Sequence, residues 1–417
     1  MEINVVSHLR PRGEKLSADN AVTWKQRARL SIGQGALTNS KRPECFVEGV
    51  YPTHITRAKG CYVYDDKGRR MIDFICALGT NLFGYAHKEI NDVVKMQLDQ
   101  GSLYSLGSTL EVEFAEKVQA VFPFIERIKI LKSGSAGCTA AVTIARAHTG
   151  RRNILSEGYH GHDPEFVSLT APANGVVPHM HICALNQEPS MIDPGVAAVI
   201  VEPVLTDASP YRIAYLRALR ELCTRNGTLL IFDETITALR FPGLSFAKYS
   251  GITPDLIVMG KALANGLPIS VVGGRKEIME GEFFISTTFA GDTLALRAAM
   301  KVLEMAPSVV PRMWDEATLF QAQFNAIEPE LVTIEGYPTR GIFKAKDDLT
   351  KALFFQECAK AQILVGPSFF WCEPHREESV TVLKVMKTIL TRVKNGECRL
   401  EGKMPVTPFA AKQRGQS

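Results

Sequence analysis

Strand-length stretches alternate with amphipathic helical patterns along most of the chain. Apolar runs at residues 229–232, 256–259 and 269–272 are each bounded by turn residues, as expected of strands buried on both faces of a sheet. Residues 211–226 place apolar side chains on one helical stripe, which Gly227 ends. Further strands are predicted at residues 127–131, 153–155 and 197–201. Because strand and helix alternate repeatedly, we predict an α/β fold with a mostly parallel sheet wrapped by helices.

The two ends of the chain depart from this alternation. Residues 1–45 are polar and predict an arm with a helix at residues 21–30. Residues 48–73 indicate antiparallel strands around a hairpin turn at residues 65–68. Beyond about residue 301 the pattern becomes helix, strands and a closing helix. We therefore predict three parts: an N-terminal arm with a small antiparallel unit (1–70), a large domain (71–300) and a small C-terminal domain (301–417).

Composition and charge narrow the class of protein. Apolar residues make up 46% and charged residues 22% of the chain, which is typical of a soluble globular protein, and no apolar run reaches the roughly 18 residues of a membrane span. The nine cysteines show no paired or metal-binding spacing and the N-terminus lacks a signal-peptide pattern, so we expect reduced thiols in a cytoplasmic enzyme. The net charge, 48 − 44 = +4, disfavours nucleic acid as a partner but leaves it open.

Two chemically useful side chains follow neighbouring predicted strands. Asp233 directly follows the run at residues 229–232, and Lys261 follows the run at residues 256–259. The carboxyl ends of parallel strands hold the ligands of open α/β sheets. Partial burial would lower the pKa of Lys261 and free its amine as a Schiff-base nucleophile, while a carboxylate facing a pyridine nitrogen is the usual partner of pyridoxal phosphate. Taken alone, Asp233 is better explained as a helix cap and Lys261 as a solvated side chain.

Three further turns follow predicted strands. Ser133-Gly134-Ser135 opens a helix of small residues, a geometry that presents backbone N–H groups and a positive helix end to phosphate. Tyr159-His160 comes after the strand at residues 153–155, and Glu202 ends the strand at residues 197–201. His160 and His162 resemble metal ligands, but no third ligand has matching spacing, so no metal site is predicted.

The segments FDETITALRF and GITPDLIVMGKALANGLPISVVGG resemble the core of class III (ornithine-type) pyridoxal-phosphate aminotransferases. They are most similar to glutamate-1-semialdehyde 2,1-aminomutase and its relatives. The resemblance extends over nearly the whole chain and implies a fold type I transferase. Such a fold has a mostly parallel seven-stranded sheet in a large domain and a small α+β domain.

The resemblance also implies residue roles. Lys261 would form the Schiff base and serve as general base, and Asp233 would hold the pyridine proton. Thr288, in STTFAGD, would reach the cofactor phosphate from the neighbouring subunit, which implies a homodimer with shared active sites. The expected contacts of pyridoxal 5′-phosphate, with pyridoxamine 5′-phosphate as an intermediate form, are Gly134, Ser135, Tyr159 (stacked on the ring), His160, Glu202, Asp233, Thr235, Lys261 and Thr288.

The resemblance leaves the reaction and the substrate open. We predict an aminotransferase or aminomutase acting on an amino-bearing small molecule, with residues 78–81 as substrate neighbours. Ala136 replaces an acidic residue common in relatives, and Phe369-Phe370-Trp371 is expected at the pocket rim, so a substrate unlike glutamate semialdehyde is favoured. Arg240 matches a family arginine that is either structural or substrate-binding. The alternatives are a decarboxylase or isomerase acting on a larger carrier, such as a nucleotide sugar or modified nucleobase, and a catalytically silent scaffold.

Overall fold

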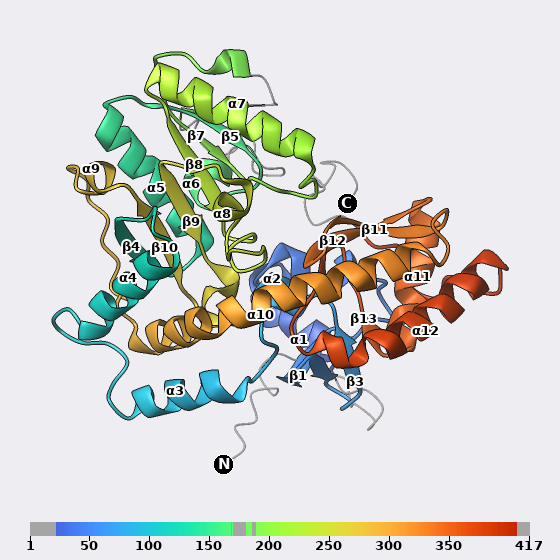
Figure 1. The fold of residues 1–417 in the computed structure, drawn as a ribbon. Helices are drawn as coiled ribbons and strands as arrows, with labels where there is room; N and C mark the ends of the chain where they lie inside the picture. Colours follow the sequence, from blue (N-terminus) through green and yellow to red (C-terminus); the bar gives the residue numbers. More distant parts are fainter. Residues whose placement is uncertain (1–21, 168, 170–180, 186–188, 407–417) are drawn as a thin grey trace.

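The computed structural model describes residues 22–167, 169, 181–185 and 189–406. A seven-stranded sheet forms the centre of its larger part (Figure 1), in the order β4-β10-β9-β8-β7-β5-β6. The strands β6, β5, β7, β8 and β9 pair in parallel, whereas β10 is antiparallel to both β4 and β9. The strands are β4 (Arg127–Leu131), β5 (Asn153–Glu157), β6 (Ile182–Ala184), β7 (Val196–Val201), β8 (Leu229–Glu234), β9 (Leu256–Met259) and β10 (Ser270–Gly274). The predicted α/β class with a mostly parallel sheet is confirmed.

Helices cover the sheet and connect it to the rest of the molecule. Their ends follow local signals: Ser108 and Glu111 form a capping box at the start of α4, and Gly227 ends α7 in the left-handed conformation. Among the described residues, no helix combines the length and the apolar composition needed to cross a membrane. The helices are α1 (Trp24–Ser31), α2 (Cys76–Gly79), α3 (Lys88–Leu98), α4 (Thr109–Val121), α5 (Gly134–Thr149), α6 (Pro164–Val167), α7 (Pro210–Asn226), α8 (Phe246–Ser250), α9 (Lys276–Met279), α10 (Thr293–Asn325), α11 (Asp348–Lys360) and α12 (His375–Lys394).

Alternate residues of the central strands supply two separate cores. On one face of the sheet, Ile231 packs in a cluster with Ala141 of α5. On the other face, Phe232 packs in a cluster with Leu216 of α7. Because successive side chains of a strand point to opposite faces, Asp233 belongs to the face that α5 covers. The Asp233 carboxylate therefore faces α5 and not α7.

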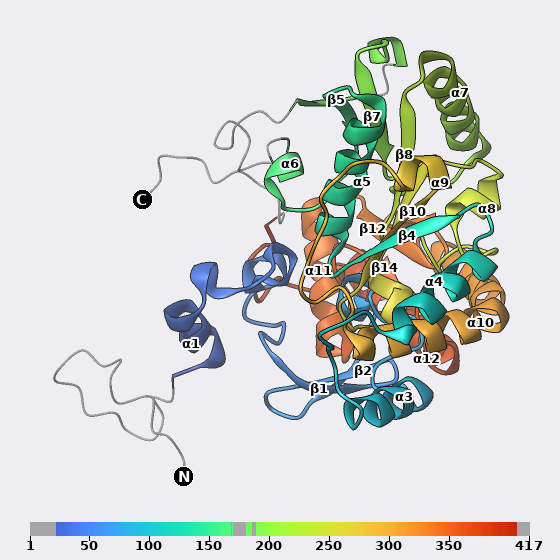
Figure 2. The ribbon, with the colours of Figure 1, turned by 90° about the vertical axis from the view of Figure 1, so that its left-hand side faces the viewer.

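Two smaller sheets join segments that are far apart in the sequence. The N-terminal hairpin pairs through β3 with β13 in parallel, and β12 pairs with β11 and β14 in antiparallel fashion. These strands are β1 (Ile55–Lys59), β2 (Tyr62–Asp65), β3 (Arg70–Asp73), β11 (Val332–Tyr337), β12 (Arg340–Ala345), β13 (Ile363–Leu364) and β14 (Phe369–Phe370). In Figure 2, α1 projects from the rest of the molecule beside this region. The predicted boundary at residue 300 falls within α10, which runs along both parts in Figure 1, and the three-part division stays a prediction.

The aromatic run at residues 369–371 was expected at a pocket rim, and this expectation is wrong. Phe369 stacks on Phe74, with ring centroids 5.2 Å apart, and Trp371 is fully buried beside Phe320. Burying large apolar rings stabilises the fold more than leaving them at a wet rim. The aromatic run therefore belongs to the core and gives no information about the size of the substrate.

Candidate active site

The predicted site residues gather at the carboxyl edge of the central sheet. In the parallel pair β8–β9, Asp233 is in register with Val258, and Lys261 follows two residues beyond the end of β9. The Gly134 turn follows β4, the Tyr159-His160 pair follows β5, and Glu202 follows β7. Five strands thus deliver polar side chains to one edge, as expected of an open α/β sheet.

Asp233 is a buried carboxylate held by three donors. Its Oδ2 accepts a hydrogen bond from His160 Nδ1 at 2.8 Å and from the Cys138 thiol of α5 at 3.2 Å. Its Oδ1 accepts from the backbone N–H of Thr235 at 3.0 Å. Burial would raise the pKa of Asp233, but the hydrogen bonds from His160 and Thr235 outweigh it and lower the pKa below its ordinary value. The site therefore holds a fixed negative charge at the end of β8.

Lys261 stands in a strained turn. Its φ of +41° lies in the left-handed region, and it opens the 3₁₀ helix Lys261–Ala264. An L-residue in this region costs roughly 1–2 kcal/mol, and such strain is concentrated at functional sites. Burial lowers the pKa of Lys261, and the negative charges of Asp233 and Glu202 oppose this effect. The direction agrees with the expected activation of the amine, and both carboxylates act on the charge of Lys261.

Asn265 anchors the lysine turn to the loop that precedes α3. Its Oδ1 accepts hydrogen bonds from the backbone N–H groups of Leu82 (2.8 Å) and Phe83 (2.9 Å), and its Nδ2 donates to the Gly84 carbonyl at 2.9 Å. We did not identify this residue from the sequence. An asparagine four residues after the lysine, in Lys261-Ala-Leu-Ala-Asn265-Gly, is the available signal, because asparagine tolerates the left-handed conformation that it adopts here.

Glycines allow the turns at this edge to approach one another closely. A Cβ on Gly134 would lie 2.7 Å from the Thr235 side chain. A Cβ on Gly161, whose φ is +110°, would lie 1.9 Å from the Ser135 hydroxyl. That hydroxyl accepts a hydrogen bond from the backbone N–H of His162 at 3.1 Å. The turns after β4, β5 and β8 are therefore packed against one another, with Ser135 and Thr235 between them.

Glu202 and Tyr159 form a second contact in the site. Glu202 Oε2 accepts a hydrogen bond from the Tyr159 backbone N–H at 2.9 Å, and burial together with the Asp233 charge raises the pKa of Glu202. Tyr159 is 46% exposed. Its predicted stacking role stays a prediction.

Thr288 stands apart from the other predicted residues. It lies exposed on the loop before α10, and it makes no hydrogen bond within the described part of the chain. In the same loop Asp292 pairs with Lys132 at 2.8 Å, directly before the Gly134 turn. The single chain does not itself give Thr288 a ligand-binding role.

Arg240 is a structural residue. Its side chain is fully buried and donates to the backbone carbonyls of Gly79 (2.8 Å), Trp371 (3.0 Å) and Thr339 (3.2 Å). It therefore ties the predicted substrate loop at residues 78–81 to the smaller sheets. With its donors directed to backbone carbonyls, Arg240 is not placed to bind a substrate carboxylate.

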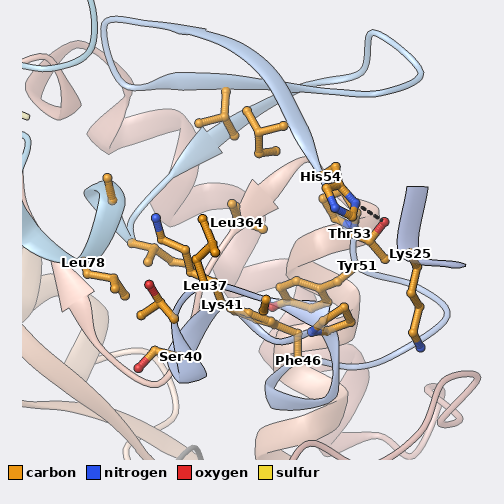
Figure 3. Close-up of a pocket in the computed structure, with 18 of the residues that line it drawn as sticks. Lys25, Leu37, Ser40, Lys41, Phe46, Tyr51, Thr53, His54, Leu78 and Leu364 are labelled. Carbon is orange, nitrogen blue, oxygen red and sulfur yellow. Dashed lines mark hydrogen bonds between the residues drawn. The ribbon is translucent and has the colours of Figure 1, made fainter. Parts of the chain in front are cut away.

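A cavity of about 580 Å³ lies beside this loop but away from Asp233 and Lys261, neither of which lines it. Figure 3 shows Leu78 at one side of the cavity and Leu37, Ser40 and Lys41 of the N-terminal arm around it. The candidate catalytic residues therefore lie at the ends of the strands and not in this cavity.

A model of the family described as aminotransferase class-III matches residues 47–327, more than half of the chain. The chain belongs to the class III aminotransferases. Within this family, it is 33% identical over 285 residues to a glutamate-1-semialdehyde 2,1-aminomutase of Syntrophobacter fumaroxidans, covering 62% of the chain and 66% of that protein. It is 34% identical over 311 residues to the aminomutase of the same name from Symbiobacterium thermophilum, covering 67% and 71%.

Solved structures share the fold of this class III aminotransferase. The FumI protein of Sphingopyxis sp. MTA144 superposes with a TM-score of 0.84 at 22% identity, covering 92% of this chain and 98% of that one. A β-phenylalanine aminotransferase from Variovorax paradoxus superposes with a TM-score of 0.78 at 23% identity, covering 89% and 93%. These structures show a fold type I architecture, and the family match together with the two aminomutase relatives supports a pyridoxal-phosphate-dependent aminotransferase or aminomutase.

The residues present fit pyridoxal phosphate. Asp233 keeps its negative charge in a buried position, as a partner of a protonated pyridine nitrogen must. The hydroxyl of Thr235 is buried and has no partner among the described residues, and it lies against Gly134 at the start of α5. The helix start supplies the backbone N–H groups of Gly134 and Ser135 for a phosphate.

Proposed function

We propose that this enzyme moves an amino group on a small amino-bearing molecule, between two substrates or within one, with Lys261 and Asp233 as its catalytic residues. The observation that carries the proposal is the buried Asp233–His160 pair at the end of β8, electrostatically coupled to Lys261 beyond the end of β9. A lone carboxylate or a lone lysine would not support it.

The residues of the chain have separate tasks in this proposal. Lys261, whose lowered pKa favours the neutral amine, binds the cofactor and then carries a proton to and from the substrate carbon that bears the amine. Asp233 holds the proton on the pyridine nitrogen, and His160 Nδ1 fixes the carboxylate in place. Gly134 and Ser135 bind the phosphate. When bound, the cofactor supplies the electron sink for the chemistry at that carbon.

Tyr159, Thr235 and Glu202 complete the cofactor pocket in the proposal. The half-exposed Tyr159 ring covers one side of the cofactor, and Glu202 positions it through the Tyr159 backbone N–H. Thr235 contacts the opposite side from between the Gly134 and Lys261 turns. Since Phe369–Trp371 is core, the argument for a bulky carrier substrate no longer applies, and nothing in the site favours a silent scaffold.

Incubation of the purified holoenzyme with amine donors, followed by mass spectrometry of both products and cofactor, tests this function. An aminotransferase converts the cofactor to its amine form and releases a carbonyl product, and an aminomutase returns an isomer of its substrate. Loss of CO₂ from the substrate would identify a decarboxylase and would contradict the proposal.

The proposal includes a homodimer in which Thr288 completes the partner's phosphate site. Two neighbouring loops carry exposed apolar side chains: Phe284 and Phe289 are 90% and 62% exposed, and Leu106 is 85% exposed. The Thr293 backbone N–H donates to the Ser102 carbonyl at 3.0 Å, which joins the loop before α4 to the loop before α10. An apolar surface of this kind is expected where a second subunit binds.

A mixed dimer tests this arrangement. One subunit carries Lys261→Ala, and the other carries Thr288→Ala and keeps its lysine. If Thr288 acts on the partner's site, the intact lysine shares its site with an intact threonine, and cofactor affinity at that site is normal. Weak cofactor binding at that site, or a fully active monomer in light scattering, would contradict the shared site.

A further inference from the structure

Arg340 extends from the small C-terminal sheet towards the active-site edge. It is the first residue of β12, opposite Phe370 of β14, and β12 faces the larger part of the molecule in Figure 1. Its Nη1 donates to the carbonyl of Leu205, three residues beyond Glu202 on the segment that follows β7. The guanidinium therefore crosses from the small sheet to the segment that carries an active-site carboxylate.

The charge of Arg340 has no anionic partner in the described part of the chain. No Asp or Glu of that part lies within ion-pair distance, and Nε is buried without a hydrogen-bond partner. A half-buried guanidinium that lacks both a counter-charge and full hydrogen bonding is costly unless a ligand supplies them. Arg240 likewise has a buried Nε without a partner and no ion pair in the described part of the chain, but both of its Nη groups donate to backbone carbonyls, whereas Arg340 donates only from Nη1.

The positive charge of Arg340 also acts on the reactive amine. The pKa of Lys261 is lowered by burial first and also by the positive charge of Arg340. The same charge acts on the buried hydroxyl of Tyr337, which ends β11 and pairs with Arg340 across the hairpin. The cation thus lies within electrostatic reach of the amine of Lys261.

We infer that Arg340 binds a carboxylate of the amino substrate and makes an amino acid, not a simple amine, the preferred substrate. This inference rests on the proposed function of the same site. The planar guanidinium offers two parallel N–H donors that match a carboxylate, and a substrate carboxylate would satisfy both the free charge and the buried Nε. Arg240 is fully buried and its Nη groups donate to backbone carbonyls, so Arg340 is the better placed of these two arginines to bind a ligand.

Matched amines test the inference in the holoenzyme. Each series of probes has one amine skeleton that carries a carboxylate, a phosphonate or no acidic group. The three-carbon series is 4-aminobutanoate, 3-aminopropylphosphonate and propylamine. The two-carbon series is alanine, 1-aminoethylphosphonate and ethylamine. Conversion of the cofactor is followed by absorbance in the wild type, Arg340→Gln and Arg340→Lys. Arg57→Gln is the matched control, because Arg57 is exposed on β1 and lies over the Tyr64 ring.

We expect the wild type to prefer the carboxylates. In Arg340→Gln, kcat/KM for the carboxylates should fall about 10- to 100-fold, mainly through KM, as is usual for the loss of a hydrogen bond to a charged group. Propylamine and ethylamine, which carry no acidic group, should be unaffected, and Arg340→Lys should retain part of the preference. An equal loss for all three probes of a series would overturn the inference, as would a preference for the phosphonates, which would indicate a phosphate-bearing amine.

Binding of butanoate keeps the inference testable without turnover. Calorimetry of the holoenzyme should detect butanoate binding in the wild type and in Arg57→Gln and a much weaker affinity in Arg340→Gln. Equal affinities would overturn the inference. A wild-type protein that binds no pyridoxal phosphate would instead contradict the proposed function, so the two failures are distinct.

Discussion

Replacing His160 by leucine should shift the acid limb of the enzyme's pH profile. The substitution replaces the buried imidazole by an apolar side chain of similar size and removes the donor that lies 2.8 Å from Asp233 Oδ2. It breaks no hydrogen bond of the other ring nitrogen, because His160 Nε2 has no partner among the described residues. The carboxylate would keep its hydrogen bonds from Cys138 and the Thr235 backbone and lose its strongest donor.

The magnitude follows from the hydrogen bond. A hydrogen bond to a charged group contributes about 1.5–3 kcal/mol, and one pKa unit corresponds to about 1.36 kcal/mol, so the pKa of Asp233 should rise by about 1–2 units. In the wild type this pKa is lowered, so the stabilising charge is present above the unfolded value and is lost only as pH falls through the folded value. In His160→Leu that loss should begin about 1–2 pH units higher.

The assay is the pH dependence of kcat/KM and of cofactor affinity. His160→Asn, whose side-chain amide can still donate, should restore most of the wild-type profile. His148→Leu, at an exposed position near the end of α5, should leave the profile unchanged. An acid limb in His160→Leu that coincides with the wild type, at unchanged cofactor affinity, would refute the positioning role of His160.

Two further substitutions test the packing of the site. Gly161→Ala should lower the melting temperature and weaken cofactor binding, because its φ is +110° and a Cβ would lie 1.9 Å from the Ser135 hydroxyl. Gly150→Ala, with a φ of +67° and open space around the Cβ, is the control and should show only the smaller backbone effect, as thermal unfolding of both variants would reveal. Asn265→Leu should cost about 1–3 kcal/mol for each buried backbone N–H that loses its acceptor, and it should slow the reaction more than it weakens phosphate binding. Wild-type unfolding and rate in Asn265→Leu would show that this residue does not anchor the lysine turn.

Strands buried on both faces were predictable because their whole length is apolar. The bounds of β4 and β9 agree with the prediction, since turn residues follow each run directly. The end of β8 was missed by two residues, because Asp233 and Glu234 continue the strand although they are charged. Their burial is satisfied by hydrogen bonds from distant parts of the chain, which no local pattern reveals.

Relations between distant segments were not predictable. An apolar run does not encode strand direction, so the antiparallel placement of β10 could not be inferred, and neither could the pairing of β3 with β13. The aromatic run at residues 369–371 misled for the same reason, because its burial depends on Phe74 and Phe320. Arg340 lies in no recognisable motif, and only the fold brings it to the carbonyl of Leu205, on the segment that follows Glu202.

The central claim is that Lys261 is the amine that binds pyridoxal phosphate. Reduction of the holoenzyme with sodium borohydride makes that bond permanent, and peptide mapping by mass spectrometry then locates it. The account predicts one labelled peptide, with the added mass on Lys261, and no label in Lys261→Ala. A label on any other lysine of the wild-type protein, or an undiminished label in Lys261→Ala, would contradict the claim.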